Sequence, residues 1–122
     1  MEQQRFSWKK RGNSFQFAWN GIRAVLRTEH NTWIHLALTL AVVTGGIGFR
    51  IGRQEWIVLI LAMAFVWVTE ILNTAIEKAM DFISMERHPM IRLVKDLAAA
   101  AVLIASLAAL IIGCLIFIPK LF

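Results

Sequence analysis

The sequence has one cysteine and few charged residues, and both scarcities limit what the protein can be. Charged residues make up 17% of the 122 residues, whereas 58% are hydrophobic, and the mean hydropathy is +0.63. A soluble domain of this size could not bury so much apolar surface, so we expect a single membrane-embedded domain. Cys114 lies in an apolar run and cannot form an internal disulfide, so we expect it to serve as packing.

Several kinds of site are also missing from the sequence. No basic stretch rich in aromatic residues is present, so we expect no nucleic-acid partner. His30, His35 and His88 share no ligand spacing, which argues against a zinc site. The glycine cluster at 45–48 is not followed by Lys and Ser or Thr, as a phosphate-binding loop requires, and we expect it to bend or end a helix. The basic N-terminus leads into an amphipathic segment rather than an apolar one, so we expect no cleavable signal peptide.

Hydrophobic periodicity predicts an all-α integral membrane protein. Residues 1–13 form a polar, basic tail. Residues 14–28 repeat apolar side chains at helical spacing and predict an amphipathic helix in the membrane interface, with Ser14 as a plausible N-cap. Three long apolar runs follow, the last of which we expect Pro119 to end. The predicted transmembrane helices are 32–49, 54–83 and 91–117.

The basic residues predict an orientation. One side of the predicted membrane region carries three of the 13 lysines and arginines: Arg50, Arg53 and Lys120. The other ten lie in the N-terminal segment or between residues 78 and 95, and the N-terminal group suits an anionic membrane surface or a nucleotide phosphate. The positive-inside rule therefore places the N-terminus in the cytoplasm and the C-terminus outside.

A polar stripe follows one face of the predicted helix 54–83. Its members are spaced three, four and four residues apart, which places them within roughly 80° of one another: Glu70, Asn73, Glu77 and Asp81. A charge inside a membrane helix costs at least ~2.5 kcal/mol and is rare without a function. Glu70 follows Trp56 by 14 residues, about 21 Å of helix, which places it in the cytoplasmic half of the bilayer. Joining helices is the alternative role for such residues.

The acidic groups near this interface suit phosphoryl transfer. Glu29 and Glu77 could hold Mg²⁺, which prefers one or two carboxylates together with substrate phosphates. Glu70 lies deeper and drier, as suits a general base acting on a hydroxyl, and Asn73 could orient it. Lys95 could neutralise phosphate charge. The acceptor would be a lipid alcohol, because the base lies at membrane depth.

Each of these residues also has a plainer explanation. Glu29 alone could be a solvated interfacial acid, and the Lys95–Asp96 pair could be an exposed charge pair at the start of a helix. Two other functions therefore stay open on the residues alone: a small proton-coupled transporter, in which Glu70 would bind and release a proton, and a non-enzymatic membrane subunit.

Small residues recur at every fourth position of the last predicted helix, which favours close helix packing. They are Ala101, Ala105, Ala109 and Gly113. Three helices are too few to enclose a polar site comfortably, so we expect self-association, with some carboxylates meeting across subunits.

A long spaced motif resembles the signature of the prokaryotic diacylglycerol kinase family, which includes undecaprenol kinases. The motif reads Glu70-Ile-Leu-Asn73-Thr-Ala-Ile-Glu77 with Asp81, followed by Lys95-Asp96-x-Ala-Ala-Ala-Ala-Val-Leu-Ile. The resemblance extends over nearly the whole chain and includes Trp19-x-Gly21-x-Arg23.

The resemblance implies a homotrimeric membrane enzyme with three spanning helices and an interfacial N-terminal helix in each subunit. Such an enzyme transfers the γ-phosphate of MgATP to a lipid hydroxyl, at sites shared between subunits of the bacterial inner membrane. Carried onto this chain, the resemblance makes Glu70 the general base and gives Mg²⁺ to Glu29 and Glu77. The residues expected to bind ATP and substrate are Arg23, Glu29, Asn73, Glu77, Lys95 and Asp96.

Three short segments favour undecaprenol as the acceptor. Glu29-His30-Asn31-x-x-x-His35-Leu36, Arg87-His88-Pro89 and Ile116-Phe117-Ile118-Pro119 resemble the undecaprenol-kinase branch more than the enterobacterial diacylglycerol branch. The product would then be undecaprenyl phosphate. Phosphorylation of diacylglycerol to phosphatidic acid stays the alternative within the family.

Overall fold

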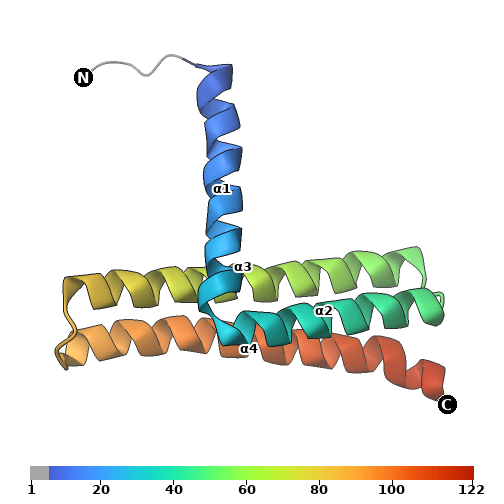
Figure 1. Cartoon of the computed structure of the whole chain (residues 1–122). Helices are drawn as coiled ribbons and strands as arrows, with labels where there is room; N and C mark the ends of the chain where they lie inside the picture. Colours follow the sequence, from blue (N-terminus) through green and yellow to red (C-terminus); the bar gives the residue numbers. More distant parts are fainter. Residues whose placement is uncertain (1–5) are drawn as a thin grey trace.

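A computed structural model describes residues 6–122 and shows an all-helical chain in that range. Its four helices are α1 (Trp8–Thr28), α2 (His30–Gly48), α3 (Arg53–Ile83) and α4 (Pro89–Leu121). α2, α3 and α4 lie along a common axis, with successive helices running in opposite directions, whereas α1 runs across that axis (Figure 1). The turn between α2 and α3 lies at the same end of the bundle as the C-terminus, and the α3–α4 connection lies at the other end (Figure 1).

α1 begins earlier than the predicted interfacial helix 14–28. Ser7 takes the N-cap position, and the hydroxyl of Ser14 donates to the carbonyl oxygen of Lys10 within the helix, so the expected cap at Ser14 was wrong. Residues 9–11 are lysines and arginine, good helix formers that extend the helix through much of the predicted tail. The first five residues of that tail lie outside the described range.

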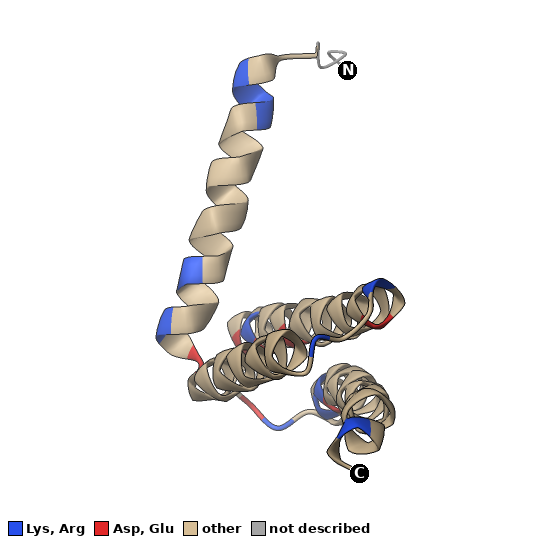
Figure 2. Cartoon of the chain, turned by 90° about the vertical axis from the view of Figure 1, so that its right-hand side faces the viewer, with Lys and Arg blue, Asp and Glu red and all other residues tan. Residues whose placement is uncertain are grey.

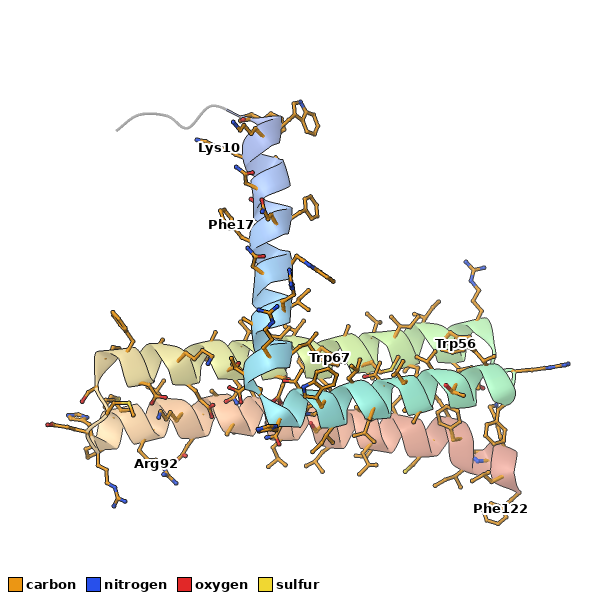
Figure 3. All side chains as sticks on the ribbon, viewed as in Figure 1. Lys10, Phe17, Trp56, Trp67, Arg92 and Phe122 are labelled. Carbon is orange, nitrogen blue, oxygen red and sulfur yellow. The ribbon has the colours of Figure 1, made fainter. Side chains whose placement is uncertain are left out.

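The apolar side chains of α1 have no partner among the other described helices along most of its length. Phe15, Phe17 and Trp19 are 59–80% exposed, and Phe17 projects from α1 clear of the bundle (Figure 3). Only Val25, near the end of the helix, is buried. Figure 2 shows a group of basic residues at each end of α1, with uncharged turns between them. An amphipathic helix of this kind can lie in a membrane interface.

Most helix–helix contacts join α3 to α4. At one end of this hairpin Leu59 and Ile116 pack with Ile51 in a small apolar core. Farther along, Ala98 and Ala105 are buried against α3, while Ala101 at the start of the small-residue ridge is exposed. The ridge therefore packs within the chain only in part.

The turn between α2 and α3 depends on a close approach. A Cβ atom on Gly46 would lie 2.6 Å from Cη2 of Trp56, so only glycine fits there without movement of the indole. Arg50 in the same turn has φ 52°, the left-handed region that side chains seldom adopt. The glycine cluster thus ends α2 and admits Trp56, in line with the expectation that it bends or ends a helix.

Two helices, α3 and α4, are long and apolar enough to cross a bilayer among residues 6–122. At 31 and 33 residues, they are about 46 and 50 Å long, so both must extend beyond a hydrocarbon core of about 30 Å. α2 has only 19 residues, and His30, Asn31 and His35 make its first turns polar. Spanning by α2, the predicted first transmembrane helix 32–49, stays a prediction.

α4 is longer at both ends than the predicted helix 91–117. Pro89 occupies its first turn, where a missing N–H costs nothing, and Nδ1 of the preceding His88 accepts from the backbone N–H of Met90. Pro119 was expected to end the helix, but α4 continues to Leu121. The helix bends near this end (Figure 1), as a proline in the last turns can cause.

Candidate functional site

The polar stripe of α3 changes in exposure along the helix. Glu70 is buried at 7% exposure, Asn73 and Glu77 are half-buried, and Asp81 is exposed. Thr74, one turn after Glu70, is also buried. The stripe therefore leads from a buried carboxylate toward the solvated end of the α3–α4 hairpin. A different part of the chain contacts the buried, the middle and the solvated level of the stripe.

At the buried level, α2 supplies a histidine. Nε2 of His35 lies 3.4 Å from Oε2 of Glu70. Beside it, the indole N–H of Trp67 donates to Oγ1 of Thr39 at 2.9 Å, and the rings of His35 and Trp67 meet edge to face. The helices α2 and α3 are thus joined by polar contacts next to Glu70.

At the middle level, the corner between α1 and α2 supplies Glu29. This residue has extended backbone between the two helices, and its Oε1 lies 4.0 Å from Nζ of Lys78. Lys78 is next to Glu77 in α3. The corner therefore brings Glu29 to the level of Glu77, the other predicted magnesium ligand. Glu29 and Glu77 are both half-buried.

At the solvated level, α4 supplies Lys95. Its Nζ lies 2.6 Å from Oδ1 of Asp81. Asp96 lies on another side of α4, where it pairs with Arg92 one turn earlier on the same helix. The structure therefore brings Lys95 to the stripe and leaves Asp96 exposed.

Arg23 is the predicted site residue that lies farthest from the stripe along the chain. It is exposed on α1, and no ion pair involves it among residues 6–122. Six residues, about 9 Å of helix, separate it from Glu29. This chain alone therefore does not bring Arg23 into contact with the other predicted site residues.

A magnesium site completed by nucleotide phosphates fits the residues at the middle level. Among the described residues no group of three His, Cys, Asp or Glu side chains could hold a metal ion, so a cation held by Glu29 and Glu77 would need phosphate oxygens to complete its coordination. Oδ1 of Asn73, one turn before Glu77, is buried without a hydrogen-bond partner in the described chain. These oxygen ligands match the preference of Mg²⁺ for carboxylate and amide oxygens.

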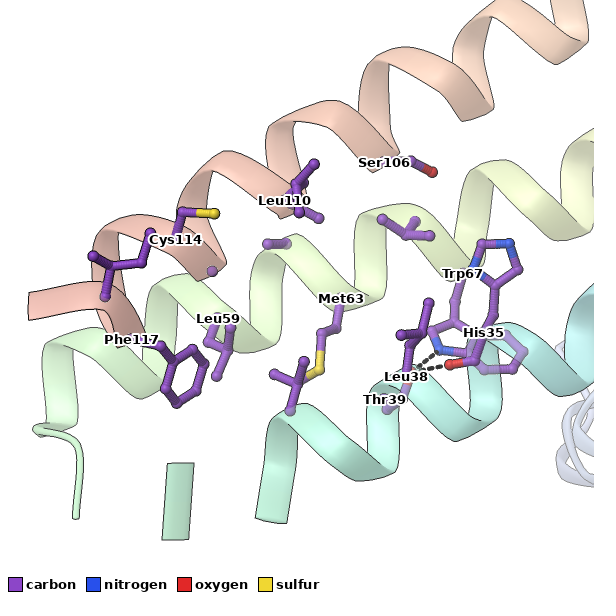
Figure 4. A pocket seen from close by; sticks show the side chains of 16 residues that line it. His35, Leu38, Thr39, Leu59, Met63, Trp67, Ser106, Leu110, Cys114 and Phe117 are labelled. Carbon is purple, nitrogen blue, oxygen red and sulfur yellow. Dashed lines mark hydrogen bonds between the residues drawn. The ribbon is translucent and has the colours of Figure 1, made fainter. Parts of the chain in front are cut away.

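Two cavities flank the stripe. An apolar pocket of about 370 Å³ lies between α2, α3 and α4 and extends from His35 and Trp67 to Phe117 (Figure 4). A polar cleft of about 530 Å³ lies at the α3–α4 connection, where Lys95 and Asp81 border it. The apolar pocket suits a lipid chain, and the polar cleft suits a charged, water-soluble group.

Sequence reasoning assigned no role to His35 or to the Trp67–Thr39 contact. The histidines were considered as zinc ligands and as parts of segments that resemble the undecaprenol-kinase branch, and their spacing along the chain carries no sign of a contact with Glu70. Thr32 also had no assigned role; it is fully buried, and its Oγ1 has no hydrogen-bond partner among residues 6–122. Only the packing of α2 on α3 shows which α2 side chains reach the stripe.

Comparison with known proteins identifies the family. Residues 16–117 match the family model described as prokaryotic diacylglycerol kinase. The chain is 40% identical over 108 residues to undecaprenol kinase of Bacillus subtilis, covering 88% of each chain. It is 33% identical over 108 residues to diacylglycerol kinase of Escherichia coli, covering 82% of each chain.

A further relative has a longer chain. Diacylglycerol kinase of Synechocystis is 35% identical over 109 residues, which cover 88% of this chain and 62% of that protein. The family match extends over most of helices α1 to α4 and includes the whole polar stripe. The resemblance noted in the sequence is therefore confirmed: the chain belongs to the prokaryotic diacylglycerol kinase family, a family of membrane-embedded lipid kinases.

Proposed function

We propose that this lipid kinase transfers the γ-phosphate of ATP to undecaprenol and so forms undecaprenyl phosphate. The relative from Bacillus subtilis, with 40% identity, is named an undecaprenol kinase. Relatives with 33–35% identity are named diacylglycerol kinases, so diacylglycerol is the second candidate acceptor. Family membership already favours the kinase over the transporter and the non-enzymatic subunit.

The buried carboxylate of Glu70 carries the proposal. It lies beside a histidine that lines the apolar pocket, and Asn73 and Glu77 follow it on the same face of α3. A lipid chain in the pocket would present its hydroxyl near this carboxylate. Glu70 would accept the hydroxyl proton while the lipid oxygen bonds to the γ-phosphorus and the bond to the β-phosphate oxygen breaks, which releases ADP.

Glu29 and Glu77 would hold Mg²⁺, with the free amide oxygen of Asn73 close by on α3. When bound, the ion neutralises charge on the phosphates. Lys95 borders the polar cleft and would contribute positive charge to the nucleotide phosphates. Asp96 pairs with Arg92 on another side of α4, so it would contact the nucleotide only after a change of that side chain or from a neighbouring subunit. Arg23 would reach the nucleotide or lipid headgroup only when another subunit or a membrane surface completes the site.

The remaining expectations concern assembly and topology. A homotrimer with sites shared between subunits would cover part of the exposed apolar surface of α2–α4, and lipid chains would cover the rest. The N-terminus would be cytoplasmic and the C-terminus outside in the bacterial inner membrane, with α2 as a third span beside α3 and α4. The position of the C-terminus opposite the α3–α4 connection supports this topology (Figure 1).

A parallel assay tests the proposed acceptor. Purified protein in micelles, with labelled ATP and Mg²⁺, is offered undecaprenol or diacylglycerol at equal mole fraction. We expect a higher kcat/KM with undecaprenol. A higher value with diacylglycerol would assign the second candidate, and transfer to neither would contradict the proposed function.

A further inference from the structure

His35 lies at the boundary between the apolar pocket and the buried carboxylate of Glu70. Its side chain lines the pocket, and its Nε2 lies 3.4 Å from Oε2 of Glu70. The His35 side chain is 21% exposed and that of Glu70 9% exposed, so water competes little for either group. Glu70 itself is not among the described residues that line the pocket. His35 therefore connects the pocket to the carboxylate.

The surroundings of His35 join its part of α2 to Trp67 on α3. The hydroxyl of Thr39 donates to the backbone carbonyl of His35 at 2.7 Å and accepts from the indole of Trp67 at 2.9 Å. The Trp67 ring centroid lies 6.3 Å from that of His35. Trp67 precedes Glu70 by about one helical turn. Figure 4 shows His35 and Thr39 on α2 beside Trp67 on α3. The contact between His35 and Glu70 thus depends on the packing of α2 on α3.

We propose that His35 is a positioning residue for Glu70, an inference that rests on the proposed role of Glu70 as base. A neutral imidazole has one N–H, and with the proton on Nε2 it would donate to Oε2 of the carboxylate once the two atoms approach more closely. Oε1 is then left to accept the hydroxyl proton of the lipid. A distance of 3.4 Å is long for such a bond, and catalytic hydrogen bonds often shorten when substrate binds.

Two plainer roles for His35, metal ligand and packing residue, do not account for its contact with Glu70. A metal ligand would need further ligands, and no group of three such side chains exists in residues 6–122. A packing residue would need only its ring in the apolar pocket, whereas His35 also places a nitrogen near the carboxylate of Glu70. The positioning role accounts for both the ring and the nitrogen.

Two amide substitutions separate these roles. In His35→Gln the amide nitrogen can occupy the place of Nε2, whereas in His35→Asn it reaches only the place of Nδ1. Kinase assays in micelles should show kcat within about threefold of the unchanged protein for His35→Gln and at least about tenfold lower for His35→Asn. KM for lipid and for ATP should stay within about twofold in both, because substrate binding is retained.

His30 provides the matched control, since it is an exposed histidine on the same helix. His30→Asn should leave kcat unchanged. Equal kcat in His35→Gln and His35→Asn would overturn the proposal, as would a raised lipid KM at unchanged kcat. Loss of the folded state in both variants would assign His35 a structural role and overturn it too. If Glu70→Gln stays fully active, the proposed role of Glu70 as base fails; if only the His35 variants stay active, the inference alone fails. Transfer to neither lipid by the unchanged protein is the separate result that contradicts the proposed function.

Discussion

Nζ of Lys95 lies 2.6 Å from Oδ1 of Asp81, and this ion pair ties the start of α4 to the last turns of α3. Both groups are substantially exposed, with side-chain exposures of 34% and 46%. Exposed pairs of this kind stabilise a fold by only about 0–1 kcal/mol. The pair lies beside the polar cleft, where the proposed role of Lys95 in phosphate binding would need it.

Lys95→Met should lower kinase activity more than it lowers stability. We expect kcat/KM for ATP to fall at least about tenfold, since a cation that meets phosphate is lost, while the free energy of unfolding changes by about 1 kcal/mol or less. Lys120→Met is the control, because Lys120 pairs with Glu55 at the opposite end of the hairpin. Equal activity in the two variants would remove Lys95 from the site.

The proposed magnesium ligands Glu29 and Glu77 can be tested separately. Glu29→Gln and Glu77→Gln should each raise the Mg²⁺ concentration needed for half-maximal activity by about tenfold or more, because each removes a charged ligand. Chelation of Mg²⁺ should abolish transfer by the unchanged protein. Glu55→Gln, at the other end of α3, should leave the Mg²⁺ dependence as it was. A Glu77→Gln variant with an unchanged Mg²⁺ requirement would exclude Glu77 as a ligand.

Gly46 should be critical for stability because of its contact with Trp56. In Gly46→Ala the new methyl group would lie 2.6 Å from the indole, so the ring or α2 must shift, at a cost of about 1–3 kcal/mol. Gly48→Ala is the matched control, since a Cβ atom there meets nothing within 4 Å. Thermal unfolding in micelles measures both. Similar melting temperatures for the two variants would contradict this close contact between Gly46 and Trp56.

The elements that could be predicted from sequence are those that depend on local pattern. Hydrophobic periodicity and length identified the long helices α3 and α4, and three- and four-residue spacing identified the stripe from Glu70 to Asp81. The errors lie at helix ends. Pro119 was expected to end α4, yet a proline in the last turn removes only one N–H and the helix continues past it.

The contacts across helices could not be predicted in this way. Nothing in the sequence pairs His35 with Glu70, because the two are 35 residues apart and meet only when α2 packs on α3. The pairing of Lys95 with Asp81 likewise depends on the register of the α3–α4 hairpin. The motif therefore identified candidate residues, whereas only the helix packing shows which side chains contact them.

The most direct test of the account is the activity of Glu70→Gln. This variant keeps the size of the side chain but removes the group that would accept the lipid hydroxyl proton, so the rate of phosphate transfer from ATP to undecaprenol should fall by about 10²–10⁴-fold. Circular dichroism and the melting temperature should show that the helices remain folded. A folded Glu70→Gln protein that phosphorylates lipid at the rate of the unchanged protein would contradict the central claim.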